Sequence, residues 1–211
     1  MGLTILLLAK KSRAAYQDPL SYSPARLIYE GGTYQTTWDD WLWMARACYG
    51  EDNCFDGQSA VSWCMLQRFA ARAQAGRKET LTALIRSFSQ PVNPIWSSVE
   101  GCRDGRGCCG QTMGACSPEK LQRRSYIQSR DWSWFEENQR ELLELVLSFA
   151  QGMAPGNDVP GYTNFAASYT FAQNCSPGEG KRIGGNCFVY GSPPLRGRVV
   201  VEGVSSDRGG W

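Results

Sequence analysis

Residues 38–70 read WDDWLWMARACYGEDNCFDGQSAVSWCMLQRFA, and this stretch decides the fold of the chain. Apolar residues recur at intervals of three and four on both sides of a short polar segment, which predicts two helices joined by a tight loop. Asp39 and Asp40 suit the first turn of the first helix because the helix dipole favours negative charge there. We expect Gly50 to end that helix, so that Glu51 stands at the joint between the two helices.

This placement of Glu51 has chemical consequences. A carboxylate just past the end of a helix faces the negative end of the dipole, and Trp43, Tyr49 and Phe55 could wall it from water. Both effects disfavour the charged form and raise the pKa, as a general acid working near neutral pH requires. The plainer alternative is a solvated loop glutamate, and position alone favours that alternative.

The chain of 211 residues contains no histidine. This excludes Ser-His-Asp and Cys-His nucleophile systems and the HExxH zinc motif. Hydrolytic chemistry would then rest on carboxylates, hydroxyls or amines, and cleavage of a glycosidic bond by a carboxylic acid fits that restriction. Eight tryptophans would suit stacking on sugar rings, whereas a net charge of +2 is too small to argue for a nucleic-acid partner.

Nine cysteines are many for a reduced cytosolic enzyme. None forms a CxxC pair, although Cys102, Cys108, Cys109 and Cys116 could hold zinc as an all-cysteine site of irregular spacing. A disulfide framework is the better interpretation and implies an oxidising destination. The odd count leaves at least one free thiol or one intermolecular bridge.

The chain is expected to divide into three parts. Residues 1–35 are interpreted as an N-terminal arm, residues 36–195 as one domain, and residues 196–211 as a C-terminal tail. The arm contains a short apolar run that is followed, not preceded, by its charges. That order is wrong for a signal peptide and the run is too short to span a membrane, so we expect delivery without an export signal.

Beyond the first two helices, the sequence predicts helices over residues 79–88 and 132–151, and Pro118 at a first helical position predicts another over residues 118–129. The pattern changes after residue 155, and residues 183–190, IGGNCFVY, predict a strand or a hairpin. One more short strand is expected over residues 199–201. The chain is therefore predicted to be α+β and mainly α, with a small β-hairpin region and extended terminal arms.

Four segments stand out in chain order: ARACYGEDNCFDGQSAVSWCMLQRF (45–69), SFSQPVNPIW (87–96), GYTNF (161–165) and RIGGNCFVY (182–190). Together they resemble the SleB/CwlJ-type cell wall hydrolases found in spore-cortex lysis and many phages. The corresponding motifs of that family are A-R-x-x-x-G-E…G-Q-x-A-V-A-x-x-x-x-N-R, Q-F-S…N-P, G-A-T-H-Y/F and x-I-G-G-H-x-F-Y. The resemblance covers about residues 38–191.

The resemblance implies a lysozyme-like helical domain that degrades peptidoglycan. Glu51 would be the single catalytic residue of a lytic transglycosylase acting on the MurNAc–GlcNAc bond, with the muramyl 6-hydroxyl as nucleophile and no metal or cofactor. A hydrolase would need a second carboxylate, for which Asp52, Asp56 and Asp39 are candidates. The substrate-binding residues implied by the resemblance are Ser89, Gln90, Asn93, Thr163, Asn164, Tyr169 and Asn186.

Two positions depart from the family's motifs, because Asn164 and Asn186 stand where the family has histidines. An amide can imitate histidine as a hydrogen-bond donor and acceptor. If the histidines move protons, activity in this chain would be weakened or lost. The loop after Glu51 is also shorter than the family's and lacks its second glutamate, while Cys48 and Cys54 flank the loop and could brace it.

Other functions stay open at this point. The chain could be a structural protein of a phage tail or baseplate that carries a degenerate, inactive hydrolase domain and binds other tail proteins, for instance through an intermolecular disulfide. The histidine losses and the odd cysteine favour this alternative. A third function is glycan binding without turnover. The expected location is a virion or an extracellular or periplasmic space, with peptidoglycan strands as partner.

Overall fold

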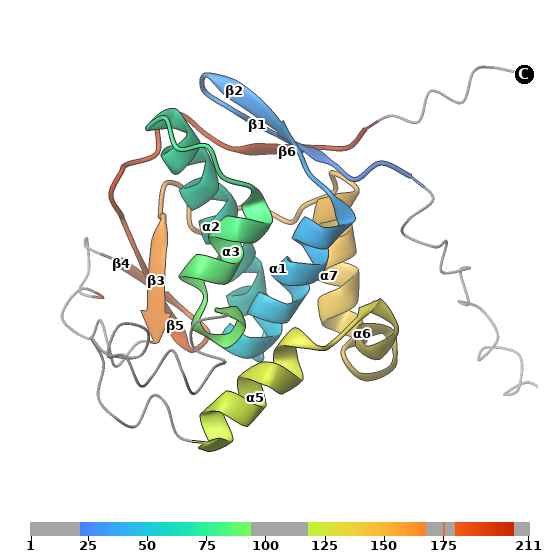
Figure 1. Ribbon diagram of the computed structural model, residues 1–211. Coiled ribbons are helices and arrows are strands. Elements are labelled where there is room, and N and C mark those ends of the chain that lie inside the picture. The colour runs from blue at the N-terminus through green and yellow to red at the C-terminus, as the bar shows by residue number, and fades with distance from the viewer. Residues whose placement is uncertain (1–21, 94–117, 168–174, 176–179, 205–211) are drawn as a thin grey trace, which may run out of the picture.

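The computed structural model describes residues 22–93, 118–167, 175 and 180–204 (Figure 1). In these ranges the fold is α+β and mainly helical, as predicted. A short 3-10 helix, η2 (Gln90–Val92), follows α3. The α-helices are α1 (Trp38–Glu51), α2 (Phe55–Gln74), α3 (Leu81–Phe88), α5 (Pro118–Gln128), α6 (Trp132–Asn138) and α7 (Arg140–Ala150).

The two helices expected from residues 38–70 are present as α1 and α2. A capping box starts α1, because the Thr37 hydroxyl accepts from the Asp40 backbone N–H and the Asp40 carboxylate accepts from that of Thr37. The prediction that Gly50 ends this helix is wrong. The helix continues through Glu51. Because Gly50 has no side chain, the last turn of the helix can lie in close contact with Pro91.

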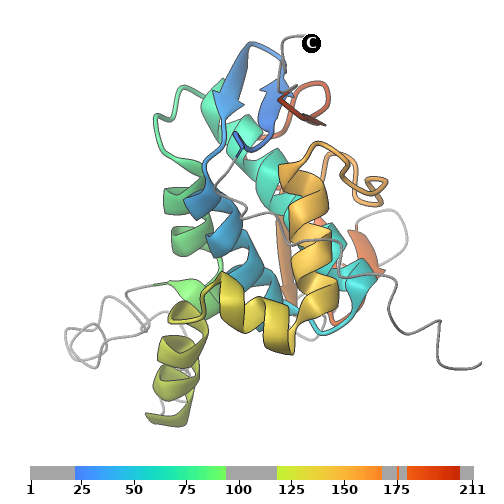
Figure 2. The same cartoon turned by 90° about the vertical axis from the view of Figure 1, so that its right-hand side faces the viewer.

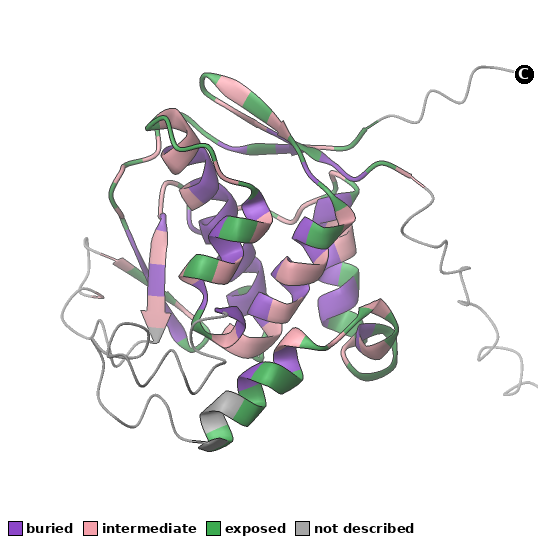
Figure 3. Cartoon of the chain, viewed as in Figure 1, coloured by how far each residue is buried: buried purple, intermediate pink, exposed green. Residues whose placement is uncertain are grey.

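The core lies where α1, α2 and α7 pack together. Trp41 and Met44 of α1, Met65 of α2 and Phe149 of α7 are fully buried. Burial of such large apolar side chains is the main favourable contribution to folding. In Figure 3 the buried positions gather on the facing sides of these helices, whereas α5 and α6 are largely exposed. The two central helices are therefore held from several sides, which gives Glu51 a rigid support.

The helix predicted over residues 132–151 is two helices, α6 and α7, separated by one non-helical residue. Two tryptophans of α6 contact opposite ends of α1: Trp132 lies 6.2 Å from Trp38, and Trp134 lies 5.2 Å from Tyr49, between ring centroids. These two positions are about 16 Å apart along α1. The short helix α6 therefore contributes a tryptophan ring to each end of α1, while α7 packs against the core.

A first antiparallel sheet joins the two ends of the described chain. Its strand order is β2-β1-β6, with Leu27 of β1 opposite Val201 of β6, and both of these side chains are buried. Part of the predicted arm and part of the predicted tail therefore form one sheet. The strands are β1 (Arg26–Tyr29), β2 (Gly32–Gln35) and β6 (Val200–Glu202).

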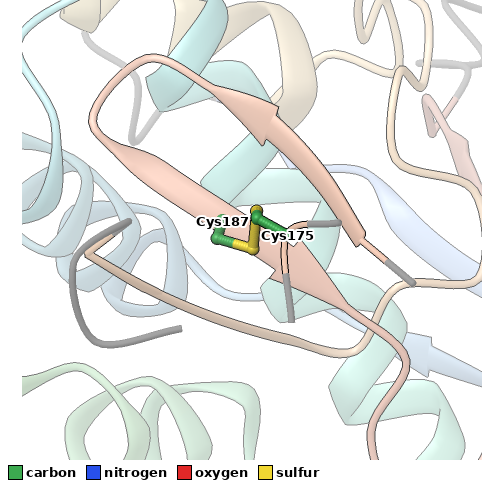
Figure 4. Close-up of a disulfide and its surroundings, with 2 residues drawn as sticks. All are labelled: Cys175 and Cys187. Carbon is green, nitrogen blue, oxygen red and sulfur yellow. A yellow bond between two sulfur atoms is a disulfide. The ribbon is translucent and has the colours of Figure 1, made fainter. Parts of the chain in front are cut away.

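A second antiparallel sheet contains the hairpin predicted near residue 183, and its order is β3-β5-β4. The strands are β3 (Asn164–Ala167), β4 (Gly180–Ile183) and β5 (Asn186–Val189). Gly184, at φ +57°, and Gly185 make the turn. A disulfide joins Cys175 to Cys187 of β5 (Figure 4). The sheet packs against α2 beside the start of that helix (Figures 1 and 2).

Two sequence predictions concern membranes and metals. None of the helices in the described ranges has both the length and the apolar character needed to cross a bilayer. Within the same ranges, no group of three or more cysteine, aspartate or glutamate side chains is placed to hold a metal ion. The four cysteines of the alternative zinc site, Cys102, Cys108, Cys109 and Cys116, lie outside the described residues.

Candidate active site

Glu51 is the last residue of α1, and its partly buried side chain meets the segment that follows α3. The Ser89 hydroxyl donates to Oε1 of Glu51 at 2.7 Å. The backbone N–H of Gln90 also hydrogen-bonds to the Glu51 carboxyl group. Two donors from one segment therefore hold this carboxyl group, which makes it a fixed group rather than a freely moving loop side chain.

The environment of Glu51 raises its pKa from 4.5 to about 7. Burial is the largest cause, because it disfavours the charged form, and the negative charge of Asp52 adds to the rise. The hydrogen bonds from Ser89 and from the Gln90 backbone act in the opposite direction, since they stabilise the carboxylate. A carboxyl group with a pKa near 7 can both give and take a proton close to neutral pH.

Gly50 brings the Ser89 segment within reach of Glu51. A Cβ atom at Gly50 would lie 2.2 Å from Cβ and 2.6 Å from Cγ of Pro91. The proline ring therefore packs directly on the α1 backbone, and this contact sets the position of η2. Ser89 stands just before η2, so the close approach of η2 to Gly50 also brings the Ser89 hydroxyl to the neighbouring Glu51.

Asp52, a candidate second carboxylate, is buried and its oxygens are occupied. Its Oδ1 accepts from the Cys54 backbone N–H at 3.1 Å, and its Oδ2 accepts from the Gly185 backbone N–H at 2.9 Å. The Asn186 side-chain amide donates to Oδ2 as well, at 3.1 Å. The Asp52 carboxyl group therefore links the loop after α1 to the turn between β4 and β5. Because both of its oxygens already accept hydrogen bonds, they are poorly placed to activate water.

Asn186, one of the predicted substrate-binding residues, is 2% exposed and lies at the start of β5. Its amide nitrogen donates to the backbone carbonyl of Glu51 at 3.1 Å as well as to Asp52. The side chain is thus directed at the backbone of the candidate catalytic residue. Such a donor role needs no proton transfer, so an amide can perform it at any pH.

The third motif is anchored by the end of the first. Gln67 of α2 donates its amide to the carbonyls of Val159 and Tyr162 at 2.8 and 3.1 Å. Arg68 donates to the Thr163 carbonyl at 2.9 Å, and its guanidinium carbon lies 4.1 Å from the Phe88 ring centroid. These contacts join α2, the end of α3 and the start of β3 next to the Glu51 region.

Other predicted substrate-binding residues have varied positions. Thr163 is buried and its hydroxyl accepts from the Gly191 backbone N–H at 3.0 Å, while Asn164 is partly exposed at the start of β3. Gln90 is exposed. Asn93 is buried and its amide donates to the Ser87 carbonyl at 3.1 Å. Tyr169 lies outside the described residues.

The remaining candidate carboxylates are not gathered around Glu51. Asp56 is exposed in the first turn of α2. Asp39 is exposed in the first turn of α1, twelve positions before Glu51 along the helix, a rise of about 18 Å. Within the described ranges, Asp52 is therefore the carboxylate that accompanies Glu51.

The cysteines beside Glu51 do not brace its loop by a disulfide, as the sequence had suggested they could. Cys48, Cys54 and Cys64 are free thiols. Cys48 is buried, and its sulfur lies 3.2 Å from the Ser62 hydroxyl. Cys54 instead acts as the N-cap of α2, where its sulfur accepts from the Gly57 backbone N–H at 3.4 Å.

Sequence reasoning alone missed three features of this site: the Gly50–Pro91 contact, the anchoring by Arg68, and the binding of Asp52 to the hairpin turn. The glycines Gly57 and Gly184, which belong to the quoted motifs, carried a signal of close packing. They did not indicate that both pack against the same carboxyl group, because that contact depends on the tertiary fold.

The chain matches no protein-family model, no curated protein and no solved structure. The resemblance to cell wall hydrolases therefore rests on the four sequence motifs.

Proposed function

We propose that this chain is a peptidoglycan-cleaving glycosidase, a lytic transglycosylase that uses Glu51 as both general acid and general base. The carboxylic acid gives its proton to the oxygen of the MurNAc–GlcNAc bond as that bond to the anomeric carbon breaks. The resulting carboxylate then takes the proton of the muramyl 6-hydroxyl, while the oxygen of that hydroxyl bonds to the anomeric carbon. The product is a 1,6-anhydro sugar, and the catalytic residue returns to its protonated form.

The observation that carries this proposal is the state of Glu51. Its pKa of about 7 allows both protonation states near neutral pH, and the hydrogen bond from Ser89 keeps the carboxyl group in one place. A general acid and base needs both properties, since the proton must be available and must be delivered in a fixed direction. A solvated loop glutamate would have neither.

The absence of a free companion carboxylate favours a transglycosylase over a hydrolase. A hydrolase needs a second carboxylate, either to attack or to activate water. Among the residues that the structure describes, Asp52 accepts three hydrogen bonds, whereas Asp56 is exposed at the start of α2. A nucleophile supplied by the substrate removes the need for that second group.

Contacts among the four motif segments support the resemblance and, with it, the choice of substrate. Ser89 of the second segment and Asn186 of the fourth both bind Glu51 of the first. Arg68, at the end of the first segment, binds the Thr163 carbonyl of the third. Segments that share a catalytic function are expected to converge in this way, and the mainly helical fold suits the proposed lysozyme-like architecture.

The test compares cleavage of purified peptidoglycan by the wild-type chain and by Glu51→Gln. The variant should lose activity by a factor of about a thousand or more, because an amide neither gives nor takes the proton. Glu137→Gln, the same change at an exposed position of α6, is the control and should retain wild-type activity. Equal activity of wild type and Glu51→Gln would contradict the proposal.

A second candidate is a phage tail or baseplate protein whose hydrolase domain is inactive. The observation that favours it is the replacement of both family histidines, by Asn164 and Asn186. In that case the wild-type chain would bind peptidoglycan but release no soluble fragments from walls of several chemotypes. Release of fragments that depends on Glu51 would rule this candidate out.

A further inference from the structure

The carboxyl group of Asp52 lies at the centre of a small, fully packed contact. It accepts three hydrogen bonds, from the backbone N–H groups of Cys54 and Gly185 and from the side chain of Asn186. Its residue is 7% exposed. Three donors around one buried carboxyl group form a charge-assisted arrangement, which is among the stronger kinds of hydrogen bonding in proteins.

Two glycines make room for this carboxyl group from opposite elements. A Cβ atom added to Gly57 of α2 would lie 2.3 Å from Cγ of Asp52, and one added to Gly184 would lie 2.4 Å from its Oδ2. No side chain fits at either position without moving the carboxyl group. The loop, the start of α2 and the hairpin turn are therefore shaped around Asp52.

The same contact reaches the backbone of Glu51. The Asn186 amide that binds Asp52 also donates to the Glu51 carbonyl, and the Asp52 backbone N–H closes α1 by donating to the Cys48 carbonyl. The Gln58 side chain donates to the Asp52 carbonyl at 3.0 Å. The last residue of α1 is thus held by the hairpin on one side and by α2 on the other.

We propose that Asp52 is a positioning residue, which holds the β4–β5 turn and its Asn186 amide against the backbone of Glu51 and so keeps the Glu51 carboxyl group in contact with Ser89. The proposal rests on the proposed function of Glu51. It assigns Asp52 no contact with substrate. In this proposal Asn186 acts only as a hydrogen-bond donor, so its position does not require a histidine that transfers a proton.

Two roles of Asp52 predict opposite changes in the pKa of Glu51. The charge of Asp52 raises that pKa, so a residue that acted only through its charge would lower the pKa when neutralised. The hydrogen bond from Ser89 lowers the pKa by more than the Asp52 charge raises it. Loss of positioning, which separates Glu51 from Ser89 while the carboxyl group stays buried, should therefore raise the pKa even though a negative charge has been removed.

Other groups around Glu51 must not titrate in the same range. From α1 the titratable neighbour is Cys48, whose burial raises its thiol pKa to about 12. From the start of η2 and the residue before it come the Gln90 backbone N–H and the Ser89 hydroxyl, and from the hairpin comes the Asn186 amide. None of these changes charge near neutral pH, so a shift can be assigned to Glu51.

The experiment follows the Glu51 side-chain carboxyl carbon by NMR during a pH titration of the wild type and Asp52→Asn. We expect a higher Glu51 pKa in Asp52→Asn than in the wild type. Asp131→Asn is the matched control, because Asp131 is an exposed cap of α6, and it should leave the Glu51 pKa unchanged. A lower or unchanged pKa in Asp52→Asn would overturn the proposal, and this readout does not depend on turnover.

A second variant moves the Asp52 carboxyl group without changing its charge. Gly57→Ala places a methyl group where that carboxyl group lies, and it should also raise the Glu51 pKa. Gly156→Ala is its control, since among the described residues, its two chain neighbours aside, no heavy atom lies within 4 Å of the added methyl group. On peptidoglycan, both Asp52→Asn and Gly57→Ala should lower kcat at least tenfold with KM changed less than threefold. An unchanged kcat in both variants would contradict the positioning role.

Discussion

Replacing Gly50 by alanine should destabilise the protein, although the same change in an ordinary helix stabilises it by about 1 kcal/mol. The added Cβ would lie 2.2 Å from Cβ of Pro91, whereas packed carbon atoms stay about 3.5–4.0 Å apart. The proline must therefore retreat by about 1.5 Å. Such overpacking costs about 1–3 kcal/mol, so we expect a net loss of about 1 kcal/mol.

The same displacement should reach the candidate catalytic residue. Ser89 stands two residues before Pro91, and a shift of this size would lengthen its 2.7 Å hydrogen bond to Glu51 beyond the limit for a good hydrogen bond, about 3.2 Å. Because this bond lowers the pKa of Glu51, its loss should raise that pKa above about 7. Cleavage needs the protonated acid, so the decline of activity at alkaline pH should move to higher pH.

Urea denaturation measures the change in stability, and an NMR titration of Glu51 measures the change in its pKa. Gly156→Ala serves as the control, because its added methyl group has open space around it and should change stability little. If Gly50→Ala were as stable as the wild type and kept the same Glu51 pKa, the close contact would not position Ser89.

Two further predictions concern stability. Because the folded protein binds the Glu51 proton more tightly than the unfolded chain does, the free energy of unfolding should fall as pH rises from about 4.5 to 7, by about 3 kcal/mol at most. Urea denaturation at several pH values should show this decline in the wild type and a smaller one in Glu51→Gln; equal declines would contradict the raised pKa. Replacing Cys175 by serine should cost about 3 kcal/mol, because its bond to Cys187 closes a loop with a sequence separation of 12. Peptide mapping without reductant should find the two cysteines linked, and free thiols at both would refute the bond.

Local patterns predicted the helical part of this fold well. Apolar residues at intervals of three and four in residues 38–70 indicated α1 and α2, and a glycine pair indicated the turn after Ile183. Such features depend on residues that are close in sequence, so a sequence contains enough information to predict them. The place of Glu51 beside a helix end only permitted a raised pKa, and its choice as the catalytic residue came from the resemblance of the four segments to a known family.

Features that depend on distant residues were not predictable in this way. The helix predicted over residues 132–151 breaks at Gln139, and no proline or glycine in the sequence marks that break. Gly50 was interpreted as a helix stop, since the sequence gives no sign that Pro91 packs against it. The pairing of β1 with β6 joins segments more than 170 residues apart. Each of these requires the tertiary fold.

Products formed in water enriched with ¹⁸O test the central claim most directly. A transglycosylase that uses Glu51 alone joins the muramyl 6-hydroxyl to the anomeric carbon, so mass spectrometry should find anhydromuropeptides that carry no oxygen from the solvent. Glu51→Gln should give no such product. Reducing ends labelled with ¹⁸O as the sole product would contradict the single-carboxyl mechanism, and unlabelled anhydro products from Glu51→Gln would contradict the role of Glu51.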